Sequence, residues 1–157
     1  MLPMITTTTT TANKVTQELI DYIDAHAKEM EAWVKAAPNR FAAYPVAEDW
    51  YLQSLVDEGV TTLPQYIHRG LVNDVFESWR SIRGYKPNWG ILNEKSIEEL
   101  RAIDAELTAE YQSQKEWEKQ QLDQAWKEAK TLASKLGQSV KTLIKWGVLD
   151  RRELYPA

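Results

Sequence analysis

The chain has 157 residues, of which 43% are hydrophobic and 27% are charged, and this composition predicts a folded protein with one main core rather than a disordered chain. It contains no cysteine, which excludes disulfide bonds and thiolate metal sites and agrees with a reducing compartment. The formal net charge is −4, and the sequence has neither a secretory leader pattern nor a run of about eighteen apolar residues, so we expect a cytoplasmic protein without a membrane segment.

The chain begins with a segment that we expect to be a flexible tail. Residues 1–12 have low complexity, with threonine at every position from 6 to 11, and they have no helical pattern. The last of these threonines or Asn13 is expected to cap the first helix, because such side chains accept hydrogen bonds from the free N–H groups at a helix start. We expect a helical bundle to follow at residues 13–110.

Three amphipathic helices are predicted within this bundle. Apolar side chains recur at three- and four-residue steps, as on one face of a helix, over residues 14–36, 48–57 and 64–82. Thr62 is expected to cap the third helix, whereas Gly59 and Gly84 are expected to end the second and the third. Residues 85–90 are rich in turn-forming residues and are expected to form an irregular connector. No segment alternates apolar and polar residues as a strand does, so the predicted fold class is all-α.

One very long helix is predicted next, over residues 96–136. No glycine or proline occurs in this stretch, and Ser96 with Glu99 forms a capping box at its start. At 1.5 Å per residue such a helix is about 60 Å long. Its middle, residues 111–121, has few apolar side chains, and we favour a polar helical bridge in solvent between two packed units. An oligomer seam or a break in the helix are the alternatives, and a continuous two-stranded coiled coil is disfavoured because the heptad pattern lapses.

Residues 122–150 have the spacing of a helix-turn-helix. A small residue, a turn glycine, a branched apolar residue and a further apolar residue stand at Ala133, Gly137, Leu143 and Trp146. If this unit binds DNA, the residues that face the major groove are Gln138, Ser139, Lys141, Thr142 and Lys145. The alternative is a terminal helical hairpin that carries these residues on its solvated face. Residues 151–157 are expected to form a tail.

The charge is distributed unevenly along the chain. Residues 91–123 carry 9 acidic and 4 basic residues, whereas residues 124–152 carry 7 basic and 2 acidic residues. This polarity is compatible with a basic end that contacts an anionic partner. The alternative explanation is that lysines such as Lys130 and Lys135 offset the dipole at a helix C-terminus.

The sequence contains no motif that indicates catalysis. The two histidines, His26 and His68, fall on different predicted helices, and no phosphate-binding loop, zinc-protease motif or nucleophile elbow is present. The acidic pairs are scattered over solvated helix faces, so a magnesium-dependent hydrolase is not favoured. We therefore expect no enzyme activity, no metal and no cofactor.

Aromatic residues provide the candidates for protein binding. Five tryptophans occupy apolar stripes and are expected in the core: Trp33, Trp50, Trp79, Trp126 and Trp146. Two others stand in polar surroundings, and exposed aromatics often anchor protein interfaces. With their neighbouring tyrosines, the candidate protein-binding residues are Tyr85, Trp89, Tyr111 and Trp117. Docking of these rings within the chain itself is the alternative.

Two short motifs carry a resemblance to a known group of proteins. The segment from Val75 to Pro87 reads VFESWRSIRGYKP and ends a helix in a Gly-aromatic-basic-Pro turn, and the segment SIEEL at 96–100 opens the next helix. With the Thr142-to-Trp146 spacing near the end, these motifs resemble small accessory proteins of tailed bacteriophages over residues 71–150. Asn88 stands where that pattern has a basic residue, so no anion-binding role is expected for the turn.

The resemblance implies a role in phage infection, and the absence of catalytic motifs favours binding. Our leading hypothesis is a non-enzymatic protein-binding accessory factor that inhibits a host or defence protein, or a nucleoprotein, in the host cytoplasm. The alternative is a helix-turn-helix DNA-binding regulator that uses residues 138–145. Nucleic-acid binding through the C-terminal unit and homo-oligomerisation both stay open.

Overall fold

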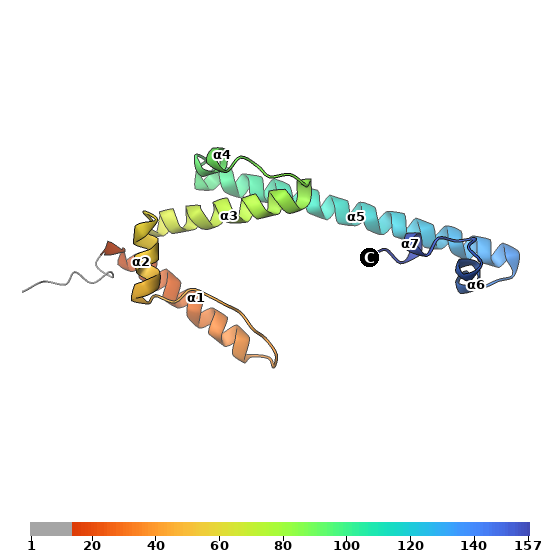
Figure 1. Ribbon diagram of the computed structural model, residues 1–157, viewed down its shortest axis with the longest axis horizontal. Helices are drawn as coiled ribbons and strands as arrows, with labels where there is room; N and C mark the ends of the chain where they lie inside the picture. Colours follow the sequence, from red (N-terminus) through yellow and green to blue (C-terminus); the bar gives the residue numbers. More distant parts are fainter. Residues whose placement is uncertain (1–13) are drawn as a thin grey trace, which may run out of the picture. The chain divides into compact units, whose positions relative to one another are not determined.

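The computed structural model describes residues 14–157, so the expected tail at residues 1–12 and the cap expected at Asn13 lie outside the described residues. Within the described part all regular structure is helical and no strand is present, which confirms the all-α prediction (Figure 1). The helices are α1 (Gln17–Lys35), α2 (Asp49–Asp57), α3 (Leu63–Arg83), α4 (Trp89–Asn93), α5 (Ile97–Leu136), α6 (Val140–Lys145) and α7 (Arg151–Leu154).

The chain divides into two compact units. The first comprises the residues up to Glu77 together with Lys86–Arg101, and the second comprises Ser78–Tyr85 together with Ala102–Ala157. Both α3 and α5 run through the two units, and α5 packs against α3. Two of the boundaries therefore fall inside continuous helices, and the third falls between Tyr85 and Lys86 in the loop after α3.

The first unit is organised by apolar side chains at the start of α1 and on one face of α2. The cluster consists of Val15, Leu19, Ile23, Leu52, Leu55 and Val60. Thr16 caps α1, because its hydroxyl accepts a hydrogen bond from the Leu19 N–H at 3.4 Å. The Thr16 N–H donates to the Thr61 carbonyl at 2.9 Å, so the same residue also joins the start of α1 to the segment before α3. Thr16, and not Asn13 or an earlier threonine, therefore caps α1, which begins three residues later than the apolar pattern predicts.

The predicted caps of the other two long helices are confirmed. At the start of α3 the Thr62 hydroxyl accepts from the Gln65 N–H at 3.4 Å, and the Gln65 side chain accepts from the Thr62 N–H at 3.2 Å. At the start of α5 the Ser96 N–H donates to Glu99 at 2.8 Å, while the Ser96 hydroxyl accepts from the Glu99 N–H at 3.1 Å. Both are capping boxes, in which two free donors are satisfied reciprocally.

α5 is one uninterrupted helix of 40 residues, which excludes the alternative of a break in its middle. Every residue from 111 to 121 is exposed, so this stretch has the solvent exposure expected of a polar bridge. Its backbone N–H groups bond to carbonyls within the same helix.

The second unit ends in the predicted helical hairpin. Gly137 has a φ of 63°, in the left-handed region, and the Gln138 N–H donates to the Ala133 carbonyl at 3.0 Å, as in a Schellman motif. Ser139 then caps α6, accepting from the Thr142 N–H at 3.1 Å. The buried residues of the second unit are Leu107, Ala129, Ala133, Leu143 and Leu154. The two alanines on α5 are small, which permits close approach of a neighbouring helix.

Two short helices replace segments that we expected to be irregular. The connector at 85–90 is interrupted by α4, which begins at Trp89 because Asn88 accepts a hydrogen bond from the Ile91 N–H at 3.1 Å. The expected tail at 151–157 instead contains α7, where Asp150 accepts from the Arg152 N–H at 2.9 Å and Leu154 is buried. Both helices are too short for apolar periodicity, so their caps are the only local signal.

Three tryptophans that we expected in the core are exposed: Trp33, Trp50 and Trp146. Only Trp79 and Trp126 of the expected set are half-buried. The apolar stripe of α1 is buried at Leu19 and Ile23 but not in its second half. An apolar residue on one face of a helix is buried only where another element packs against it. The periodicity of a single helix does not specify that packing partner.

We predict that burial, not side-chain size, decides stability on α2. Leu55→Ala should lower the free energy of unfolding by about 2–5 kcal/mol, since it leaves a cavity at a fully buried position. Trp50→Ala removes a larger side chain that is 65% exposed and should cost about 1 kcal/mol or less. Urea unfolding followed by far-UV circular dichroism measures both. An equal or greater loss for Trp50→Ala would contradict the burial pattern.

Candidate functional site

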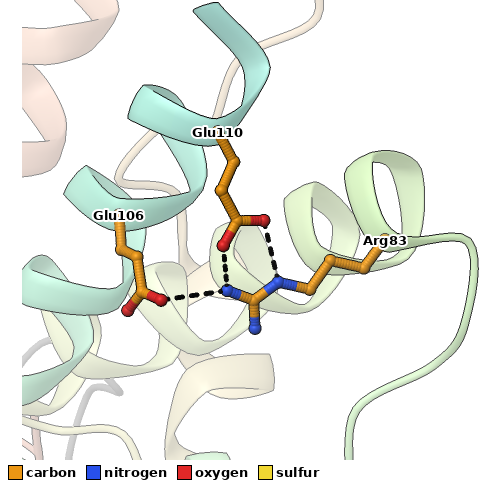
Figure 2. A network of polar contacts seen from close by, with 3 residues as sticks. All are labelled: Arg83, Glu106 and Glu110. Carbon is orange, nitrogen blue, oxygen red and sulfur yellow. Dashed lines mark hydrogen bonds and ion pairs between the residues drawn. The ribbon is translucent and has the colours of Figure 1, made fainter. Parts of the chain in front are cut away.

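The end of α3 is fastened to α5 by an arginine held between two glutamates. The Arg83 Nε donates to Glu110 Oε2 at 3.0 Å, and its terminal NH2 contacts both the other oxygen of Glu110 and, at 3.2 Å, Glu106 Oε1 (Figure 2). Glu106 and Glu110 stand one helical turn apart on α5, so both carboxylates face the same guanidinium. This paired geometry fixes α3 against α5 within the second unit.

The same arginine also orders the aromatic residues beside it. The Arg83 Cζ lies 4.1 Å from the ring centroid of Trp79. The rings of Trp79 and Tyr85 are 6.1 Å apart with an interplanar angle of 81°. Tyr85 is exposed, as expected of a protein-binding candidate, yet its ring already packs within the chain. Tyr85 therefore combines the exposure expected of a protein-binding residue with the docking within the chain that was the alternative.

Hydrogen bonding across this ion pair favours the charged form of each partner. The hydrogen bond from Arg83 holds the pKa of Glu110 below its ordinary value, and the reciprocal bond raises the pKa of Arg83. Burial opposes both shifts but is the smaller effect. The pair is thus ionised at neutral pH and serves a structural purpose, since its donors and acceptors are directed at each other.

Trp117 is the least protected of the four predicted protein-binding residues. It is 62% exposed on α5, six residues after Tyr111, which is also exposed. Lys115 lies between them, with its ammonium 5.5 Å from the Tyr111 ring and 3.3 Å from Glu118. Tyr111 is therefore partly covered by a lysine side chain, whereas no aromatic or cation–π contact within the described residues covers Trp117.

A groove of about 720 Å³ adjoins Trp117, and we call it the Trp117 groove. Its apolar lining comes from α5 and from the last residues of the chain: Trp117, Leu122, Ala125, Pro156 and Ala157. Its charged lining is Lys115, Glu118, Glu128 and Glu153. Lys115 is paired with Glu118, so the rim carries an excess of carboxylates.

Trp89 belongs to the other unit and is not part of this surface. Its ring packs against Phe76 at 5.2 Å with an interplanar angle of 66°, and the side chain remains partly exposed. His68 lines a groove of the same unit together with Trp89, and its Nε2 lies 2.8 Å from the Lys95 carbonyl just before α5. Of the four predicted residues, only Trp117 lines the Trp117 groove.

Of the residues predicted to contact DNA, two cap α6 and two line a groove. Ser139 and Thr142 form the cap of α6, with their hydroxyls 2.8 Å apart, so these hydroxyls are already engaged. Lys141 and Lys145 instead line a second groove, together with Arg151 of α7. Gln138 is exposed in the turn before the cap. α6 itself has only six residues.

The last seven residues, which we expected to form a tail, contribute to the lining of both grooves. Glu153, Pro156 and Ala157 line the Trp117 groove, and Arg151 and Tyr155 line the second one. The signal that could have indicated this is the cap residue Asp150 followed by an apolar residue four positions later. The burial of that residue depends on tertiary contacts, which no local pattern reports.

No group of three His, Asp or Glu side chains within residues 14–157 could hold a metal ion. None of the described helices combines the length and apolar character needed to cross a membrane. Comparison with protein-family models, curated proteins and solved structures found no match to this chain.

We predict that the Arg83–Glu110 pair contributes to the acid sensitivity of the protein. Because the pKa of Glu110 is lowered in the folded state, its stabilising effect is complete above the unfolded pKa of about 4.3 and is lost as the pH falls through the folded value. Glu110→Gln should therefore be less stable than the parent at neutral pH and should approach it below about pH 4. Urea midpoints measured at several pH values test this.

Glu116→Gln is the matched control for that experiment. Glu116 lies on the exposed part of α5 and makes no ion pair with the described residues. Its replacement should leave the pH dependence of the midpoint unchanged. The same pH dependence in both variants would remove the Arg83 pair as the cause.

Proposed function

We propose that this chain is a non-enzymatic protein-binding factor that presents the Trp117 groove to a partner protein. The observation that carries the proposal is the 62% exposure of Trp117 at a groove with an apolar lining. A tryptophan exposed on a rigid helix loses little conformational freedom on binding and buries a large apolar area. These properties are typical of residues that anchor protein interfaces.

The charges around the groove support a basic partner surface. The carboxylates of Glu118, Glu128 and Glu153 line the rim, and the single lysine there is already paired. Lysine or arginine side chains of a partner could pair with these acids while an apolar side chain contacts Trp117. Surfaces that bind nucleic acid have this basic character, so a nucleoprotein component fits the proposal.

We place this function in bacteriophage infection, where the factor inhibits a host or defence protein in the host cytoplasm. The support for this context is the turn motif that ends α3 and the SIEEL start of α5, which resemble phage accessory proteins. The acidic stretch at 91–123 also supports it, because such a stretch competes for a nucleic-acid-binding surface.

A regulator that reads duplex DNA receives less support. Two of its five predicted residues, Ser139 and Thr142, direct their hydroxyls at each other in the cap of α6. Recognition of base edges needs free side-chain donors and acceptors. Lys141, Lys145 and Arg151 of this unit are exposed.

The test is affinity capture from host lysate with the full chain as bait, followed by mass spectrometry. We expect a partner protein that survives nuclease treatment and that Trp117→Ala recovers about tenfold less efficiently or worse, because an interface anchor is lost. The melting temperature of Trp117→Ala should stay close to that of the parent, since the side chain is exposed.

Trp50→Ala serves as the control, because Trp50 is equally exposed but belongs to the first unit. It should recover the partner as well as the parent does. Equal recovery by the parent and Trp117→Ala would contradict the assignment of the Trp117 groove. Failure to recover any partner, with unaltered phage growth after deletion of the gene, would contradict the function itself.

A further inference from the structure

The second groove lies between α6 and α7 and differs in chemistry from the Trp117 groove. Its lining consists of Lys141, Ile144, Lys145, Arg151 and Tyr155, and its volume is about 610 Å³. We call it the basic groove. We propose that it binds single-stranded nucleic acid, with the three cations contacting phosphates and Tyr155 stacking on a base.

The three cations of the basic groove have no ionic partner among the described residues. Lys141 and Lys145 stand one turn apart on α6, and Arg151 is the first residue of α7. The neighbouring acids are engaged or placed elsewhere: Asp150 pairs with Arg152 at 2.9 Å, and Glu153 lines the Trp117 groove. Three unpaired positive charges around one depression attract a ligand with several anionic groups.

An aromatic ring stands beside these charges in a fixed position. Tyr155 is 57% exposed, and its ring centroid lies 5.4 Å from that of Trp126 at an interplanar angle of 86°. Trp126 is held in turn, because its Nε1 donates to the Leu154 carbonyl at 3.0 Å. The ring is therefore oriented before any ligand arrives, which lowers the entropic cost of stacking on it.

The combination of a positive groove and an exposed aromatic ring is typical of proteins that bind single strands. Phosphates pair with the cations, and an unpaired base stacks on the ring irrespective of its identity. The volume of the groove falls within the range of about 300–1,000 Å³ common for small-molecule sites, so a nucleotide unit can be accommodated.

Two other anionic partners fit the groove less well. Bases in a duplex are already stacked on one another and offer no free face to Tyr155. An acidic peptide could pair with the cations, but lysine is depleted at protein interfaces relative to the rest of the surface, and two of the three cations here are lysines. Single-stranded nucleic acid uses both the charges and the ring.

The test is fluorescence anisotropy of a labelled oligothymidylate of about fifteen nucleotides, titrated with the full chain at low salt. A duplex of the same length and an oligoglutamate peptide of the same charge are titrated in parallel. We expect the single strand to bind most tightly. If three phosphates are contacted, the slope of log affinity against log salt concentration should be about −2, since each phosphate on a single strand contributes about −0.7.

Paired substitutions locate the binding on the protein. Lys141→Ala with Lys145→Ala should weaken binding at least about tenfold at low salt and should reduce the salt slope by about 1.4. Lys127→Ala with Lys135→Ala is the matched control, because it removes the same charge from α5 at a groove without an aromatic ring. This control pair should change the affinity no more than about twofold.

Further variants test the ring and guard against loss of the fold. Tyr155→Ala should weaken binding about tenfold, which corresponds to the loss of one stacked base. If the melting temperature shows that this variant is unfolded, Arg151→Ala replaces it, since Arg151 is exposed and makes no ion pair with the described residues. Arg151→Ala should reduce the salt slope by about 0.7.

Four results would overturn the proposal. They are absence of binding to oligothymidylate at low salt, equal or tighter binding of the duplex, equal or tighter binding of the oligoglutamate, and an equal loss of affinity in the Lys127 and Lys135 control pair. None of these results tests protein binding at the Trp117 groove. Failure of the proposal for the basic groove is therefore distinguishable from failure of the proposed function.

Discussion

The rest of the molecule depends on the continuity of α5. No glycine or proline interrupts its 40 residues, so each internal N–H finds its acceptor within the helix. Only Leu100, Leu107, Ala129 and Ala133 are buried along it. Tertiary packing therefore covers its two ends, while its middle remains helical through its own hydrogen bonds. An exposed helix of this kind is a rigid support, and Trp117 is fixed in the middle of that support.

α7 is the element that gives the second unit two different grooves. The burial of Leu154 and the bond from Trp126 to its carbonyl hold this single turn beside α5. Glu153 of α7 joins the acidic rim around Trp117, whereas Arg151 of α7 and Tyr155, which follows the helix, line the basic groove. One short helix thus provides residues both to the surface proposed for a basic protein and to the surface proposed for a nucleic acid strand. A partner that is itself a nucleoprotein presents both chemistries.

The backbone of the second unit has the turn and the cap that the helix-turn-helix spacing predicts, and α7 is an element outside that pattern. Gly137 turns the chain and Ser139 caps α6 as the spacing predicts, because these roles are set by local geometry. The side chains that would read bases do not follow from that spacing. Ser139 and Thr142 satisfy the cap, and the lysines lie beside α7, which the helix-turn-helix pattern does not include.

Capping boxes, apolar periodicity and the absence of glycine and proline predicted α1, α2, α3 and α5 and the starts of α3 and α5, because these signals act within a few residues. The continuity of α5 was one of two alternatives, and α4 and α7 were not predicted. The polar neighbours of Trp89 and Trp117 indicated exposed side chains, with docking within the chain as the alternative. Tertiary packing leaves Trp33, Trp50 and Trp146 exposed as well, and it brings the last seven residues to both grooves. Burial is a property of two surfaces in contact, and a pattern on one helix does not specify the second surface.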